Sequence, residues 1–149
     1  MHAADLMTNR ARLTPDREAM LMLPGGRRYS YADLNTRANR LANWMRALCV
    51  EKGDRVSILA HNGNEYIDLF YGLAKIGAIF APLNCRLVAR ELVFIVNDCE
   101  PKVLLCGPEF TGVLAEMRPE IDVAHAIGLE GAQFEGALDY DAGLAAASD

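Results

Sequence analysis

The feature that most constrains this fold is a regular alternation of short apolar runs and amphipathic segments in the middle of the chain. The apolar runs cover residues 56–60, 78–83, 103–106 and 121–127. Each has the length and composition of a buried strand, and the segments between them carry apolar residues at helical spacing. Strands that alternate with helices over short loops pair in parallel and need helices on both faces. The sequence therefore predicts an α/β fold built on a parallel sheet.

The segments between these runs carry start and stop signals for helices. Asn62 is placed to cap the first helix, and Gly77 is placed to end it in the left-handed conformation that glycine adopts at little cost. Two further helices are expected over 89–97 and 109–117, and Pro119 stops the second. We therefore expect short helical crossovers between successive strands.

The first 50 residues follow a different pattern. A short helix is expected over the first dozen residues, followed by an N-terminal β-hairpin that turns at Pro24-Gly25-Gly26. Ser30 and Asp33 have the spacing of a capping box, and apolar residues over 34–48 recur at steps of four and three. A long amphipathic helix should therefore follow the hairpin.

These patterns divide the chain into three sections of one domain. Residues 1–50 hold the helix, the hairpin and the long helix, and residues 51–128 hold a βαβαβαβ core. Residues 129–149 are rich in glycine and other small residues, so we expect an irregular tail with at most a weak helix over 138–147.

Charge and hydropathy exclude two classes of partner. The net charge is −5 and the basic residues form no run, so we expect no nucleic-acid partner. The longest hydrophobic stretch, 66–83, carries the charged residues Asp68 and Lys75, so we expect no membrane span. Asp68 is expected at the surface or the end of a helix, where it is solvated or acts as a cap. Asp5 and Arg10 interrupt any apolar leader, which predicts a cytoplasmic location.

Candidate ligand contacts lie in the loops that follow the strands, because open parallel sheets bind ligands beyond the carboxyl ends of their strands. The loops are HNGN at 61–64, NCR at 84–86 and GP at 107–108. Arg86 is the most suggestive of these residues, since a guanidinium just past a buried strand suits a phosphate or a carboxylate. A surface salt bridge is an equally open interpretation of Arg86.

Two other residues of these loops have a simpler structural interpretation. His61 has the chemistry of a general base or ligand contact, but a strand-to-helix turn is the favoured interpretation. Cys85 has the chemistry of a nucleophile, yet the sequence offers it no base partner, so an inert thiol is favoured.

No familiar nucleotide or metal motif occurs in the sequence. There is no G-x-G-x-x-G and no G-x-x-x-x-G-K, and the pair Gly25-Gly26 belongs to the hairpin. The cysteines are spaced irregularly and form no C-x-x-C, so we expect reduced thiols and no metal site. They are Cys49, Cys85, Cys99 and Cys106. We also expect no catalytic residue within these 149 positions.

A series of phrases in fixed order resembles the opening segment of the adenylate-forming superfamily, over about residues 12–107. The phrases are TPDREA at 14–19, YSYADLN at 29–35, RANRLA at 37–42, KGDRV at 52–56, NEY at 64–66, LAKIGA at 73–78, PLNCRL at 82–87, EL at 91–92 and ND at 97–98. No single phrase is decisive, but the ordered set is specific. It implies an incomplete part of the large N-terminal domain of these enzymes.

The resemblance to AMP-forming acyl-CoA synthetases implies a two-step reaction. A carboxylic acid attacks ATP to give an acyl-adenylate, and CoA then displaces AMP; ATP, Mg²⁺ and CoA are therefore required. In the family a Ser/Thr/Gly-rich loop ending in Pro-Lys-Gly cradles the triphosphate, and a small C-terminal domain supplies a lysine. This sequence contains neither. We therefore expect these residues alone to bind no cofactor and to be inactive, with the rest of the chain as their partner.

One functional residue carries over from the resemblance. The phrase Asn84-x-Arg86-Leu87 resembles the acyl- and aryl-CoA ligases, in which the arginine contacts a phosphate of the CoA nucleotide. The resemblance therefore implies that Arg86 binds CoA and that the acid is fatty or aromatic.

Two other functions stay open at this stage. The first is a stand-alone binding or interaction module that kept the fold and lost catalysis. The second is an unrelated nucleotide-binding α/β protein, which the ordered phrases and the missing phosphate loop disfavour. Because so few helices are available to cover the sheet, we also expect self-association through exposed apolar surface.

Overall fold

The computed structural model describes residues 3–149, which form two compact units. The hairpin unit contains the residues through Glu51 together with Asn62–Gly77 and Leu144–Asp149. The sheet unit contains Lys52–His61 and Ala78–Gly143. The prediction that the whole chain is one partial domain stays a prediction.

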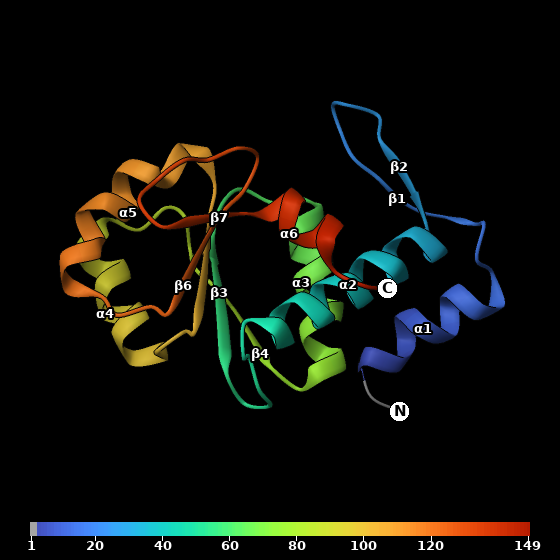
Figure 1. Ribbon diagram of the computed structural model, residues 1–149. Helices are drawn as coiled ribbons and strands as arrows, with labels where there is room; N and C mark the ends of the chain where they lie inside the picture. Colours follow the sequence, from blue (N-terminus) through green and yellow to red (C-terminus); the bar gives the residue numbers. More distant parts are fainter. Residues whose placement is uncertain (1–2) are drawn as a thin grey trace. The chain divides into compact units, whose positions relative to one another are not determined.

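The sheet unit is built on five parallel strands. Their order is β4-β3-β5-β6-β7, with β3 paired to β4 and β5, and β6 paired to β5 and β7 (Figure 1). Their bounds are β3 Arg55–Leu59, β4 Ile79–Pro82, β5 Val103–Cys106, β6 His125–Gly128 and β7 Ala137–Asp139. The fold-class prediction, a parallel α/β fold with an N-terminal hairpin, is confirmed.

The helices of the sheet unit pack against one side of this sheet (Figure 1). They are α4 (Ala89–Cys99), the short 3₁₀ helix η1 (Pro108–Phe110), α5 (Thr111–Met117) and the 3₁₀ helix η2 (Arg118–Glu120). Leu92 and Val96 of α4 meet Leu104 of β5 and Leu114 of α5 in one buried cluster. Each fully buried side chain of this size contributes about 1.5–3 kcal/mol, so this cluster fixes both helices on the sheet.

The fourth strand is shorter than predicted. The sequence indicated residues 121–127, whereas β6 begins at His125. The reason lies in its neighbour, because β5 begins at Val103, which is the residue paired with His125. Residues 121–124 therefore lie beyond the start of the partner strand and have no ladder to join.

The prediction that residues 129–149 form an irregular tail is wrong. The segment contains β7, which pairs with β6, and the helix α6 (Tyr140–Ala146) close to the predicted weak helix. β7 is three residues long and reads Ala-Leu-Asp, which is too short to stand out as an apolar run. Its pairing with β6, and not its composition, makes it a strand.

The hairpin unit contains the predicted hairpin and long helix. Its elements are α1 (Ala3–Leu13), β1 (Glu18–Leu21), β2 (Arg28–Ser30), α2 (Tyr31–Ala47) and α3 (Asn64–Ile76). The predicted capping box at the start of α2 is confirmed: Ser30 Oγ accepts from the Asp33 amide at 3.1 Å, and Asp33 Oδ2 accepts from the Ser30 amide at 2.8 Å. Ser30 donates to Asp33 Oδ2 from its backbone N–H and also from its hydroxyl at 2.8 Å, and these two bonds, the backbone one foremost, lower the pKa of the Asp33 carboxyl.

One end of α3 was predicted correctly from the sequence, and the other was not. Gly77 ends the helix in the left-handed conformation at φ 72°, as predicted. The predicted cap at Asn62 is wrong, because the helix begins at Asn64 and the capping position falls on Gly63, whose backbone is extended. No side chain caps this helix, so its start depends on the turn at Gly63.

Helices α2 and α3 pack closely where Gly72 faces α2. A Cβ atom at Gly72 would lie 2.9 Å from the Ala38 carbonyl oxygen and 2.7 Å from Leu41 Cδ2. Real Cβ atoms essentially never come this near a backbone atom, so only glycine fits without moving one helix. Gly72 thus sets the closest approach of the two longest helices of the hairpin unit.

Asp68 is buried, contrary to the prediction that it lies at the surface or the end of a helix. It is 1% exposed and faces Arg37 of α2, which donates from Nε at 3.0 Å and from Nη2 at 2.6 Å. A buried carboxylate requires such a partner, because an unpaired charge in the interior is costly. The pair therefore ties α3 to α2 beside the Gly72 contact.

Replacing Gly72 by alanine should destabilise the protein by about 1–3 kcal/mol, because the new methyl group forces the two helices apart. The control is Gly112→Ala in α5, where a Cβ atom meets nothing within 4 Å and helix propensity should add up to about 1 kcal/mol. Urea unfolding of both variants checks the opposite signs. Equal effects at the two glycines would contradict the close packing at Gly72.

Replacing Asp68 by asparagine should cost about 3–5 kcal/mol of unfolding free energy, because the largely buried Arg37 guanidinium loses the carboxylate with which it pairs. The matched control is Glu18→Gln, which breaks the exposed Glu18–Arg28 pair and should change stability by at most about 1 kcal/mol. Thermal and urea unfolding measure both. A cost at Asp68 no larger than at Glu18 would show that the buried pair is unimportant.

Candidate functional site

The sheet unit gathers the predicted contact residues at one edge. All five strands are parallel, so the residues that follow β3, β4 and β5 emerge on the same edge of the sheet. His61 follows β3, Arg86 follows β4 and Gly107 follows β5. Because β3 lies between β4 and β5, the loop carrying His61 lies between the loops carrying the other two.

Arg86 occupies a fixed turn with its side chain in solvent. Its backbone N–H donates to Asn84 Oδ1 at 3.0 Å, and the Leu87 amide donates to the Asn84 carbonyl at 3.1 Å. Among residues 3–149 the Arg86 guanidinium forms no ion pair or hydrogen bond, and the residue is exposed. Of the two open interpretations, the structure therefore favours an available cation over a surface salt bridge.

His61 has a packing role at this edge. Its ring stands edge-on to Phe110 of η1, with ring centroids 5.0 Å apart and an interplanar angle of 62°. Aromatic pairs of this geometry stabilise a fold by about 0.5–1.5 kcal/mol beyond the area they bury. The structure thus agrees with a turn residue, and His61 forms no base–nucleophile pair with the described residues.

The cysteines near this edge are thiols of the core. Cys85 is half-buried against the apolar cluster of the sheet unit, which agrees with an inert thiol. Burial, together with the nearby Glu109 carboxylate, raises the pKa of Cys106 to about 12, so this thiol stays protonated at neutral pH. Neither residue has the exposed setting that marks a nucleophile.

Gly107 allows the central loops to approach each other. A Cβ atom there would lie 3.2 Å from Ala60 Cβ, and the Gly107 amide donates to the Leu59 carbonyl at 3.0 Å. The backbone after β5 is therefore pressed against the backbone after β3. A larger residue at Gly107 would open the edge between His61 and η1.

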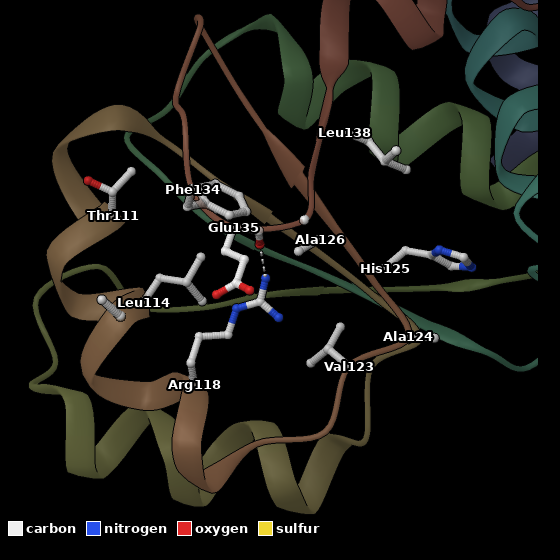
Figure 2. A pocket seen from close by; sticks show the side chains of 12 residues that line it. Thr111, Leu114, Arg118, Val123, Ala124, His125, Ala126, Phe134, Glu135 and Leu138 are labelled. Atoms are coloured by element: carbon white, nitrogen blue, oxygen red, sulfur yellow. Dashed lines mark hydrogen bonds between the residues drawn. The ribbon is translucent and has the colours of Figure 1, made fainter.

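A second feature was not predicted from the sequence. A pocket of about 600 Å³ lies between α5, the start of β6 and the loop before β7 (Figure 2). Arg118, at the end of α5, reaches across it toward Phe134 and Glu135. No motif marks this place, because the pocket is formed by segments that come together only in the folded sheet unit. Arg118, which lies between the predicted helix and Pro119, was assigned no role from the sequence.

Metal-ion clusters and membrane-spanning helices are two further features to consider in the described part of the chain. Within residues 3–149, no group of three or more His, Cys, Asp or Glu side chains gathers where it could hold a metal ion. None of the helices in that part of the chain is both long enough and apolar enough to span a bilayer.

Comparisons with known proteins identify the family to which this chain is similar. Residues 7–146 match the model of the AMP-binding enzyme family. Long-chain-fatty-acid–CoA ligase FadD13 of Mycobacterium tuberculosis is 38% identical over 117 residues, which are 78% of this chain and 23% of the relative. Crotonobetaine/carnitine–CoA ligase of Salmonella paratyphi A is 40% identical over 92 residues, which are 62% of this chain and 18% of the relative.

Solved structures agree with the sequence relatives. The N-terminal domain of FACL13 from Mycobacterium tuberculosis superposes with a TM-score of 0.88 at 34% identity, covering 99% of this chain and 37% of that one. A putative long-chain-fatty-acid CoA ligase from Rhodopseudomonas palustris superposes with a TM-score of 0.89 at 34% identity, covering 100% of this chain and 37% of that one. The chain thus spans about a quarter or less of the curated relatives it matches.

The family match takes in all but the first six and the last three residues, and the sheet order, the hairpin and the ordered phrases agree with it. The chain belongs to the AMP-binding enzyme family.

Proposed function

We propose that these residues are the N-terminal part of an ATP-dependent, AMP-forming carboxylic acid–CoA ligase of fatty acid metabolism, acting on a fatty or aromatic acid. The observation that carries the proposal is the identity of 38–40% to relatives named as CoA ligases, within a family match over residues 7–146. A cytoplasmic location is part of the proposal, and the unjoined thiols of Cys85, Cys99 and Cys106 support it.

The proposed reaction has two balanced steps. The carboxylate of the acid attacks the α-phosphorus of ATP, which forms an acyl-adenylate and releases pyrophosphate. The thiolate of CoA then attacks the acyl carbonyl, which forms the thioester and releases AMP. Mg²⁺ would offset charge on the triphosphate, but the described residues gather no ligand set for it, so no step is assigned to a metal held here.

Within this reaction we assign Arg86 to CoA binding. Three observations support the assignment: the residue lies just beyond the carboxyl end of β4, the Asn84 turn fixes its backbone, and the guanidinium forms no ion pair or hydrogen bond with the described residues. A guanidinium without an ion-pair partner can bind a phosphate without first breaking a salt bridge. The groups that cradle ATP are not among these residues, so Arg86 should serve the second step alone.

In an intact ligase that carries this segment, Arg86→Ala should raise KM for CoA by about tenfold to 150-fold, the equivalent of one charge-assisted contact. ATP–pyrophosphate exchange driven by the acid should stay near normal, because the first step does not use CoA. The matched control is Arg90→Ala on α4, an exposed arginine four residues away, which should leave both activities unchanged. Equal loss of both activities in Arg86→Ala would overturn the assignment.

The 149 residues alone should catalyse no pyrophosphate exchange with any of a panel of fatty and aromatic acids. Each missing preorganised contact to the triphosphate costs on the order of 10²–10³ in rate, and both the phosphate loop and the lysine are missing from this sequence. The assay follows labelled pyrophosphate entering ATP, with a complete family member as the positive control. Acid-dependent exchange above the no-enzyme rate would show that the chemistry resides in this segment.

The second candidate function is a stand-alone, non-catalytic interaction module. The observation that favours it is exposed apolar surface in the sheet unit: on and just before α4, Phe94 is 74% exposed and Val88 is 63% exposed, and β4 is an edge strand of the sheet. Such surface supports the proposal of self-association, which sedimentation of the purified 149 residues at several concentrations tests. A monomer at all concentrations would remove the support for a module of this kind.

A further inference from the structure

The pocket beside α5 exists because one crossover of the parallel sheet has no helix. β6 ends at Gly128 and β7 begins at Ala137, so residues 129–136 must carry the chain back to the start of the next parallel strand. Crossovers between parallel strands usually contain a helix that covers the sheet. Here a loop replaces it, and the space between α5, the start of β6 and this loop remains as a pocket of about 600 Å³. We call it the α5 pocket.

The walls of the α5 pocket are mixed, with somewhat more apolar than polar surface. Leu114 comes from α5, Val123 precedes β6, Phe134 comes from the loop and Leu138 from β7 (Figure 2). A pocket of about 300–1,000 Å³ with walls of this kind is the usual size for a small organic ligand. The apolar part of the walls therefore favours a molecule with an apolar body.

One cation, Arg118, lines this pocket. Arg118 Nη2 donates to the Glu135 carbonyl oxygen at 3.0 Å, and its guanidinium carbon lies 5.9 Å from the centroid of the Phe134 ring. These two contacts fix the guanidinium plane. Its Nε and Nη1 hydrogens meet no acceptor among the described residues, so the group keeps donors available for a ligand.

The side chain of Glu135 provides a way to test whether the pocket binds an anion. It lines the pocket next to Arg118 (Figure 2), yet its carboxylate forms no ion pair within the described part of the chain. A carboxylate so placed attracts Arg118 and repels a second anion. Neutralising Glu135 should therefore favour an anionic ligand, while the backbone carbonyl that holds Arg118 stays in place.

We propose that the α5 pocket binds a small organic carboxylate with an apolar or aromatic body, its carboxylate on the free donors of Arg118 and its body against Phe134, Leu114 and Val123. A fixed guanidinium pairs with a carboxylate in a geometry that an inorganic phosphate would share, but the apolar walls give phosphate nothing to bury. Neither His61 nor Arg86 lines this pocket, and the inference does not rest on the proposed ligase activity.

Isothermal titration of the 149-residue chain with 4-phenylbutyrate tests the proposal. The probe should bind, Arg118→Gln should weaken binding about tenfold or more, and Glu135→Gln should strengthen it about twofold to fivefold. The uncharged amide of the same acid should bind at least about tenfold more weakly than the acid. The control variant Arg90→Gln, an exposed arginine on α4 outside the pocket, should bind the probe as the parent chain does.

Absence of binding overturns the proposal, and so does equal binding by the parent chain and a folded Arg118→Gln variant. If Arg118→Gln fails to fold, Glu135→Gln decides, because it keeps the Arg118–carbonyl bond: unchanged or weaker binding overturns the proposal. Competition between inorganic phosphate and the probe is the last measurement. Phosphate that competes with the probe at equal affinity would show a general anion site, and would overturn the role given to the apolar walls.

Discussion

The pairing of β3 with a parallel neighbour on each side is the constraint on which the sheet unit depends. A strand paired on both edges exposes no backbone, and the parallel arrangement requires cover on both faces, so the strand must be apolar at successive positions. Residues Val56–Leu59 are all fully buried, and so are Val103–Cys106 of β5. Ser57 is the polar exception, and its hydroxyl lies 3.9 Å from Cys99 Sγ. The positions of β4 and β6, and hence of the carboxyl edge, follow from these two central strands.

This constraint explains which parts of the fold could be predicted from the sequence. The central strands read as continuous apolar runs, and the capping box at Ser30 and the left-handed end at Gly77 are local signals of a few residues. Such features depend on short-range chemistry. β7 could not be predicted, because three residues become a strand only through pairing with β6. Asp68 was misread for a similar reason, since its partner Arg37 lies 31 residues earlier in the chain.

The two arginines of the candidate sites differ in the same way: Arg86 could be identified from the sequence, and Arg118 could not. Arg86 could be identified because it directly follows a recognisable strand, and the structure adds the turn at Asn84 and the absence of a partner among the described residues. Arg118 follows a short helix, where a basic residue normally has no role beyond the helix end. Its position beside a pocket depends on Phe134 and Glu135, which only the loop after β6 brings near. The periodicity of the sequence does not indicate that Arg118, Phe134 and Glu135 lie close together in the fold.

Glycines in the loop after β6 explain why the α5 pocket stays open. A Cβ atom at Gly128 would lie 2.1 Å from the Ala132 carbonyl oxygen, so the chain folds back tightly against the end of β6. Gly131 and Gly136 then adopt φ of 76° and 73°, a left-handed conformation that other residues reach only with strain. These turns shape the crossover as a loop and oppose a helix, whose residues would need negative φ throughout. The pocket is therefore a consequence of glycine placement at the end of β6: the same backbone that shortens the crossover leaves the space beside α5 uncovered and brings Phe134 and Glu135 to Arg118.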